Sequence, residues 1–148
     1  GNDVADFWND TLPSEKRANF RWKQLLDAPA IILPFVDPHA YVARYAEPDK
    51  QATGLGEGMH AWPTPYWTVD GSFAVMSLLL AAHDAGLGAL FFAVFNGEQQ
   101  LRNRLGVPDH MQLLGAIACG NAVRSSEKGR SAARPRMPID EAIHQSRW

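Results

Sequence analysis

Hydrophobic residues are densest in the second half of the chain. From Phe73 to Ala82 nearly every position is apolar, which is typical of a helix that is buried on all sides. We expect this helix to begin at Asp70, whose carboxylate can accept the free N–H groups of the first turn, and to end at Gly86 or Gly88. A helix without a polar face in so short a chain predicts a second subunit that covers one of its sides.

Three shorter apolar runs have the length of β-strands. They span residues 29–36, 89–95 and 111–119. The last two are almost continuously apolar, as expected of buried strands, whereas Pro34 places the first at a sheet edge or at a bulge. Together with the helices, these runs predict an α+β fold with a central, mostly antiparallel sheet.

Capping residues mark the starts of two further helices. Asp37 and Pro38 have the residue types preferred at the N-cap and at the first helical position, which predicts a brief helix as far as Tyr45. Asn96 is positioned to cap a helix over residues 97–105. These helices would flank the sheet.

The remaining segments carry weaker patterns. Residues 1–28 favour helix, with a break at Asp10-Thr11-Leu12-Pro13, and residues 47–67 form the longest irregular stretch. A loop of that length inside a compact domain is usually functional or mobile. Residues 125–133 read as a polar loop, and the prolines that follow predict an extended tail with one helical turn over residues 140–144.

Length and charge limit the classes of protein. With 148 residues, we expect one domain spanning 1–148, and the opening Gly1 without a methionine favours a chain that is truncated at its N-terminus. The net charge of −2 gives no electrostatic basis for binding nucleic acid or an anionic membrane. The sequence contains no signal segment at its start, and we expect a cytoplasmic protein.

Few side chains suggest a reactive or metal site by themselves. Cys119 is the only cysteine, so the chain can form no internal disulfide, and its place in an apolar run predicts a small buried residue on a strand. The five histidines have no metal-ligand spacing. The sequence therefore predicts no metal ligand and no catalytic side chain.

Several motifs in a fixed order point to a family. The motifs are the apolar helix that begins at Asp70, the turn Gly86-Leu87-Gly88, the helix end Leu105-Gly106-Val107-Pro108, Gly120, and the tail Arg134-Pro135-Arg136-Met137-Pro138 before the terminal Trp148. In this order they resemble the C-terminal two-thirds of the FMN-dependent nitroreductase family, whose fold is a mixed, mostly antiparallel sheet flanked by helices, with a central buried helix at a dimer interface.

The resemblance implies a redox activity that depends on a cofactor. Members of the family use FMN, take a hydride from NADH or NADPH at the flavin N5, and pass electrons to a nitroaromatic, a quinone or a similar conjugated acceptor. In such enzymes the cofactor carries the reaction, while the protein supplies position and electrostatics. The resemblance also implies a homodimer whose sites lie at the interface between subunits.

The resemblance places four residues at the cofactor. The backbone N–H groups of Ala93 and Val94 would approach N5, and Arg134 and Arg136 would hold the phosphate. Guanidinium groups match phosphate oxygens in bidentate geometry, which suits this role. The alternatives are that Ala93 and Val94 merely belong to a buried strand and that the two arginines are solvated in a polar tail.

The chain also departs from the family pattern. The family's opening Arg-rich, Ser-containing motif and a later segment with Asn and Gln or Pro are not found in this sequence. The protein would then be either a truncated member or a flavin-free binding or structural module. A third possibility is a branch with other flavin chemistry, such as dehalogenation or flavin breakdown, decided by residues 47–67. Trp62, Tyr66 and Trp67 there form either a wall over a flat ligand or part of the core.

Overall fold

The sheet is built around one central strand. The computed structural model describes residues 3–122 and 133–146. Strands β1 (Ala30–Ile32) and β3 (Leu87–Phe92) both pair with β5 (Ala116–Asn121), in the order β1-β5-β3. A second ladder joins β2 (Phe35–Val36) to β4 (Gln112–Leu113). Every strand pairing within the described ranges is antiparallel, which confirms the predicted α+β fold.

Two of the three predicted strands are each divided in two. The run 29–36 is interrupted at Pro34, whose carbonyl accepts a hydrogen bond from Leu114 N at 3.0 Å. The run 111–119 is interrupted beside it, at Gly115, whose backbone φ of 153° favours glycine. The two breaks therefore coincide, and the paired strands change direction together. The prediction that Pro34 marks an edge strand or a bulge agrees with this, because β1 lies at the sheet edge.

Short helices occupy the segments predicted to favour helix. They are α1 (Asp3–Thr11), α2 (Ser14–Arg17) and α3 (Lys23–Leu26), with the expected break at Pro13. Helix α4 (Pro38–Tyr45) begins as predicted, because the Asp37 carboxylate accepts a hydrogen bond from His39 N at 2.9 Å. The stretch after it folds into three 3₁₀ turns, Gln51–Thr53, Leu55–Glu57 and Met59–Ala61, and α7 (Ile139–Ala142) is the single turn of the tail.

The long apolar helix α5 (Tyr66–Asp84) begins earlier than predicted. Its N-cap position is Pro65, and Asp70 lies within the helix instead of capping it. The Asp70 carboxylate accepts a hydrogen bond from the Tyr41 hydroxyl at 2.6 Å, so it pairs with α4 and not with its own first turn. The helix ends at Asp84 with Ala85 at the C-cap position, and the following Gly86 has a φ of 75°, as expected of a glycine that stops a helix.

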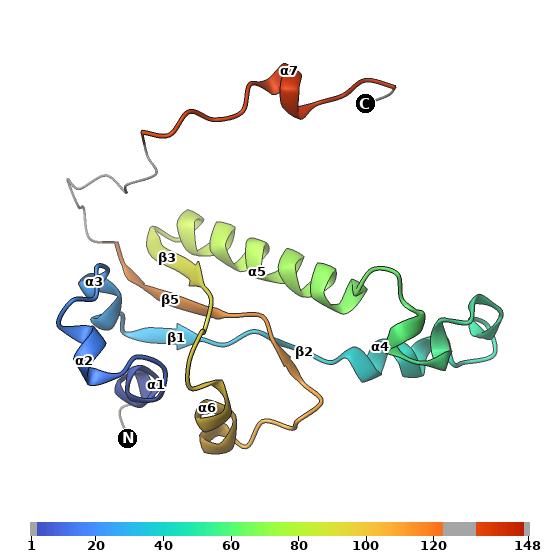
Figure 1. Ribbon diagram of the computed structural model, residues 1–148, viewed down its shortest axis with the longest axis horizontal. Helices are drawn as coiled ribbons and strands as arrows, with labels where there is room; N and C mark the ends of the chain where they lie inside the picture. Colours follow the sequence, from blue (N-terminus) through green and yellow to red (C-terminus); the bar gives the residue numbers. More distant parts are fainter. Residues whose placement is uncertain (1–2, 123–132, 147–148) are drawn as a thin grey trace.

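Helix α5 is not buried on all sides within this chain. It packs on β3, and its buried residues are Trp67, Val75 and Ala82. The opposite side of the helix carries exposed apolar side chains, which are Phe73 (66% exposed), Met76 (55%) and Leu80 (62%). In Figure 1 the helix lies along one side of the sheet with its other side facing outward. No helix in the described part of the chain is both long and apolar enough to cross a membrane.

Helix α6 (Glu98–Leu105) begins at a glycine instead of the predicted Asn96 cap. Gly97 occupies the N-cap position with a φ of 72°, and its backbone passes so close to the Asp10 carbonyl that no Cβ would fit. The contact with α1 therefore decides how this helix starts, which no local pattern reveals. Its end at Gly106 is as expected, with a left-handed φ of 65°.

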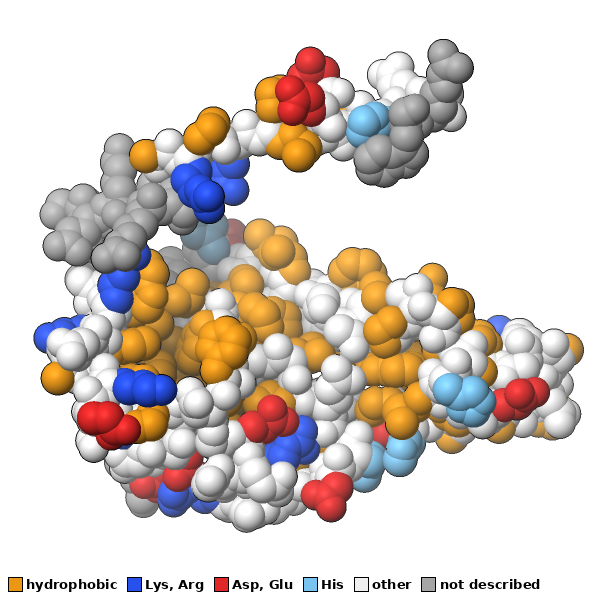
Figure 2. All heavy atoms as spheres, viewed as in Figure 1, with side chains coloured by type: hydrophobic (Ala, Val, Ile, Leu, Met, Phe, Trp, Pro, Cys, Tyr) orange, Lys and Arg blue, Asp and Glu red, His pale blue; other side chains and the backbone are white. Residues whose placement is uncertain are grey.

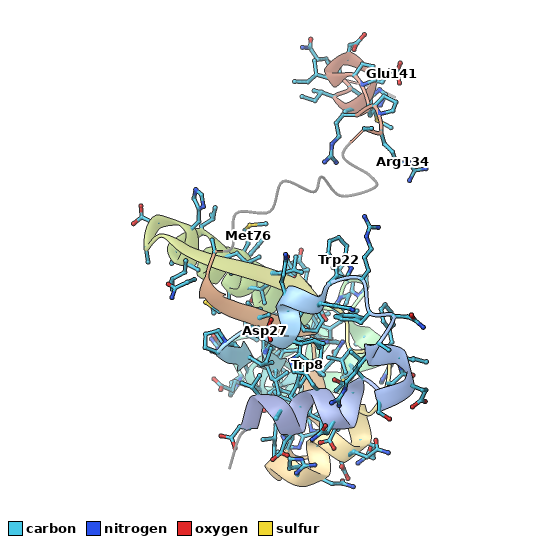
Figure 3. The ribbon with its side chains drawn as sticks, turned by 90° about the vertical axis from the view of Figure 1, so that its left-hand side faces the viewer. Trp8, Trp22, Asp27, Met76, Arg134 and Glu141 are labelled. Atoms are coloured by element: carbon cyan, nitrogen blue, oxygen red, sulfur yellow. The ribbon has the colours of Figure 1, made fainter. Side chains whose placement is uncertain are left out.

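The main core lies between α1, α6 and the sheet. Phe7, Trp8, Leu101 and Ala116 form a buried cluster, and the Trp8 ring stacks on Phe92 at 5.7 Å between ring centres. Figure 3 shows Trp8 among the side chains between α1 and the strands. On the surface above this core, the Arg104 guanidinium donates two hydrogen bonds of 2.8 Å to the Asp10 carboxylate, and this contact lowers the pKa of Asp10.

Truncation of the buried leucine of α6 tests this description of the core. Leu101 is 2% exposed, so Leu101→Ala should lower the free energy of unfolding by about 2–5 kcal/mol through lost burial and a residual cavity. Leu105→Ala is the matched control, because Leu105 lies one turn further along the same helix and is 52% exposed. Urea denaturation followed by circular dichroism measures both. Equal losses in the two variants would contradict this placement of the core.

Candidate functional site

Two glycines that are distant in the sequence face each other in the sheet. Gly88 closes the Gly86-Leu87-Gly88 turn, and Gly120 lies near the end of β5; the β3–β5 register pairs them directly. The Cβ of any other residue at position 120 would lie 2.5 Å from the Pro29 ring, and at position 88 it would lie 3.0 Å from the Ala122 backbone. Close backbone packing therefore requires a small residue at both positions.

A surface hollow lies over this glycine pair. Its volume is about 310 Å³, and we call it the Gly88–Gly120 hollow. Much of its lining consists of small residues, so a flat ligand could approach the backbone closely, while Gln24, Asp27 and Asn121 supply polar atoms. Asp27 projects from the end of α3 in Figure 3. The lining residues are 24, 25, 27–29, 88–90 and 118–122, and none of them is a lysine or an arginine.

Ala93 and Val94, predicted to approach a flavin, lie at the other end of β3. Both follow Phe92, the last residue of the strand, so the predicted strand over 89–95 is displaced toward the turn. Ala93 is exposed, and Val94 packs against the core cluster of Phe7 and Trp8. The alternative that both simply belong to a buried strand does not describe them. Neither residue lines the Gly88–Gly120 hollow.

The tail carries the two arginines predicted to bind phosphate. Arg134 and Arg136 are exposed, as are the other described residues of the tail. Figures 1 and 3 show this segment standing away from the sheet and helices, with Arg134 remote from the body of the molecule. The structure therefore brings Arg134 and Arg136 neither to Ala93 and Val94 nor to the Gly88–Gly120 hollow. Cys119 does line that hollow, on β5 as predicted, but it is half-buried instead of fully buried.

The aromatic residues of the irregular stretch pack together. Trp62 and Trp67 are 9% and 7% exposed, which favours the alternative that they form part of the core, whereas Tyr66 is 51% exposed. Tyr41 and Tyr45 of α4 contact the Trp62 ring with ring centres 5.9 and 4.7 Å apart. We call these five residues the aromatic cluster. The sequence did not reveal the two α4 members, because they come from a different element.

Two of the scattered histidines meet at the start of α4. The rings of His39 and His110 stack at 5.2 Å between centres, and His110 Nε2 lies 3.9 Å from the Asp37 carboxylate. No sequence pattern predicted this pair, since the two residues are 71 positions apart in the chain. Across the described ranges, no three His, Cys, Asp or Glu side chains are grouped so that they could hold a metal ion.

Comparison with protein families gives one clear match. The model of the Nitroreductase family matches residues 1–121 of the chain. The match includes the N-terminal helices that build the main core, which the motifs of the sequence resemblance did not cover. It ends before Arg134 and Arg136, so the predicted phosphate-binding pair lies outside the matched region.

Individual relatives agree with this match. The chain is 28% identical over 112 residues to an NADPH-dependent oxidoreductase of Staphylococcus aureus, covering 74% of this chain and 41% of that protein. It therefore spans less than half the length of that curated relative. The structure of a nitroreductase family protein from Streptococcus pneumoniae superposes with a TM-score of 0.65 at 17% identity, covering 98% of this chain and 76% of that one.

A second solved structure shares the fold. It is described as an FMN-dependent nitroreductase from Clostridium difficile, and it superposes with a TM-score of 0.60 at 17% identity, covering all of this chain and 73% of that one. At this level of identity the likeness concerns the fold alone.

The hydrogen bond between α4 and α5 gives a pH prediction. Donation of the hydroxyl to the Asp70 carboxylate raises the pKa of Tyr41 from its usual 10 to about 12. Since the native state favours the protonated phenol, this contribution to stability is complete below pH 10 and is lost between pH 10 and about 12. Phenolate absorbance should show one of the three tyrosines ionising late, and Asp70→Asn should abolish the delay. Three coincident titrations in the wild-type protein would contradict the contact.

Proposed function

The chain belongs to the nitroreductase family, and from this we propose that it acts as an NAD(P)H-dependent oxidoreductase with FMN as its cofactor. The family match over residues 1–121 is the observation that carries the proposal. Two names support the finer assignment: the Staphylococcus aureus relative is called NADPH-dependent, and the Clostridium difficile structure is called FMN-dependent. The electron acceptor would be a nitroaromatic, a quinone or a similar conjugated molecule.

The residues of the Gly88–Gly120 hollow suit the ring part of such a cofactor. A flavin ring is flat and largely apolar, and small residues such as Gly88, Ala89 and Ala118 leave its face close to the backbone. The phosphate requires cations, which the lining of the hollow does not contain. Within this chain we assign that role to Arg134 and Arg136, whose guanidinium groups are free to turn toward a ligand because they are exposed.

The protein's own part in the reaction is to bind the cofactor and to hold its ring in the correct orientation. When bound, FMN supplies a ring that accepts a hydride from reduced nicotinamide and passes the electrons on to the acceptor. Because Ala93 and Val94 lie at the other end of β3 from the hollow, their backbone amides would have to reach the reactive edge of the ring from a second subunit. The apolar side chains around the site would exclude water. No side chain is assigned as an acid or a base.

We further propose that the working form is a homodimer. The chain exposes 11033 Å², roughly half as much again as a folded monomer of this size normally does. Part of this surface is the extended tail, and part is the apolar stripe of Phe73, Met76 and Leu80 on α5. Figure 2 shows hydrophobic side chains spread over the face that carries β3 and along α5. A second copy would cover these groups and could complete a site that this chain only partly forms.

A flavin-free module of the same fold is the second candidate. The observation that favours it is the lack of a lysine or arginine among the residues that line the Gly88–Gly120 hollow. Such a protein would retain the dimeric fold and would bind or support another molecule without redox chemistry. Flavin binding separates the two candidates.

Titration with FMN tests the proposed function. The purified chain should quench flavin fluorescence on binding, and the double variant Arg134→Ala/Arg136→Ala should bind FMN at least about tenfold more weakly, because charge-assisted hydrogen bonds to phosphate are lost. The control is Lys16→Ala/Arg21→Ala, which removes the same charge from exposed positions in the N-terminal segment. Equal weakening of FMN binding in both variants would show that the effect comes from net charge alone. No binding by the wild-type chain would favour the flavin-free module.

Sedimentation analysis tests the proposed dimer. Met76→Asp places a charge in the exposed apolar stripe of α5 and should shift the protein from dimer to monomer, because burial of an unpaired carboxylate is costly. Ala74→Asp is the control, since Ala74 is an exposed residue of the same helix on a different side from that stripe. In Figure 3, Met76 lies on the outer side of α5. A wild-type protein that remains monomeric at all concentrations would contradict the proposal.

A further inference from the structure

Four members of the aromatic cluster also line a second cavity. Tyr41, Tyr45, Trp62 and Tyr66, together with Asp70, surround a space of about 370 Å³, which Leu55 and Pro63 complete. We call it the aromatic pocket. All three tyrosines of the chain lie in it. It is separate from the Gly88–Gly120 hollow, with which it shares no lining residue, and the proposed oxidoreductase function does not require it.

The rings of the pocket stand steeply inclined to one another. Trp62 is at the centre, with its plane at 80° to that of Tyr41, 74° to Tyr45 and 59° to Tyr66. Rings packed edge to face present the faces of different rings to a common space, unlike rings in a parallel stack. The face of an aromatic ring carries negative charge, so several faces around one space favour a positive guest.

Hydrogen bonds hold these rings in place. The Trp62 indole donates from Nε1 to the Leu55 carbonyl at 2.9 Å, and the Tyr41 hydroxyl donates to the Asp70 carboxylate at 2.6 Å. Trp62 is also 9% exposed, so its orientation is fixed by packing as well. The pocket is therefore formed before any ligand arrives, which reduces the entropic cost of binding.

The carboxylate of the pocket has no cationic partner. Within the described part of the chain, Asp70 forms no salt bridge, and its carboxylate accepts a hydrogen bond from the neutral Tyr41 hydroxyl. The nearby Arg44 is already engaged by Glu47 at 3.0 Å and by Asp49 at 2.7 Å. A ligand that enters the pocket thus meets an uncompensated negative charge in addition to the ring faces.

The neighbouring lysine shows the same chemistry at the edge of the cluster. The Lys50 ammonium lies 5.7 Å from the centre of the Tyr45 ring, in a cation–π contact, although Lys50 does not line the pocket. One face of Tyr45 already attracts a cation of this protein. The interior of the pocket offers further ring faces together with the Asp70 carboxylate.

We propose that the aromatic pocket binds a small organic cation with a quaternary or tertiary ammonium group. Such a cation is weakly hydrated, so it loses little hydration free energy on leaving water. In the pocket it gains contacts with the ring faces and an ionic attraction to the Asp70 carboxylate. A neutral aromatic ligand would fill the same space, but it would displace water from the Asp70 carboxylate without replacing its charge, which is unfavourable. The pocket therefore distinguishes ligands by charge as well as by shape.

Calorimetric titration of the full chain with choline tests this proposal, with 3,3-dimethyl-1-butanol as the uncharged probe of the same shape. We expect saturable binding of choline and at least about tenfold weaker binding of the alcohol. Asp70→Asn and Tyr66→Leu should each weaken choline binding, whereas Tyr66→Phe, which keeps the ring, should retain it. Tyr66 is 51% exposed, so its replacement leaves the core intact.

The control variant removes a carboxylate from the 3₁₀ turn Leu55–Glu57, and this carboxylate lies outside the pocket lining. Glu57→Gln removes one negative charge, as Asp70→Asn does, but Glu57 is exposed and does not line the pocket, so choline binding should be unchanged. Equal affinity for choline and the alcohol, equal effects of the two carboxylate variants, or no binding of choline would each overturn the proposal. None of these results depends on flavin, so the proposed oxidoreductase function is tested separately.

Discussion

The pairing of β5 with β1 and β3 is the constraint on which the rest of the structure depends. β5 is the central strand, and its residues Ala116, Ile117 and Ala118 are the most deeply buried run of the chain. Ala116 belongs to the core cluster beneath α1 and α6, while β3, its neighbour, supports α5. The same ladder sets Gly88 opposite Gly120. A shift of one residue in this register would exchange the side chains that β5 presents to its two buried faces and would separate the two glycines.

The sequence predicts best those features that depend on nearby residues. The Asp37 cap, the break at Pro13, the glycine that ends α5 and the interruption at Pro34 follow from local chemistry, and each is present. The predicted starts of two helices, α5 and α6, were wrong for a common reason. Asp70 pairs with Tyr41 instead of capping its helix, and Gly97 replaces Asn96 because α1 presses against it. In both places a tertiary contact overrides a local preference.

In the candidate sites, too, features set by nearby residues could be predicted, whereas features set by tertiary contacts could not. The Gly86-Leu87-Gly88 turn and Gly120 could be recognised in the sequence, but only the strand register reveals that they form one surface. Tyr41 and Tyr45 could not be assigned to the aromatic pocket, because no periodicity connects α4 with the segment that contains Trp62. The proposed flavin contacts of Ala93, Val94, Arg134 and Arg136 rest on the family resemblance, and a single chain does not gather them at one place.

The contact between α1 and α6 also bears on how the chain is made. Asp10 and Arg104 are 94 positions apart in the sequence, and the same two helices supply Phe7, Trp8 and Leu101 to the core. At a synthesis rate of roughly 5–20 residues per second, the first helix waits about 5–20 s for its partner to be translated. During that interval two large aromatic side chains lack their native cover. Helix α1 is therefore a segment that depends on chaperone protection until the ribosome has completed α6.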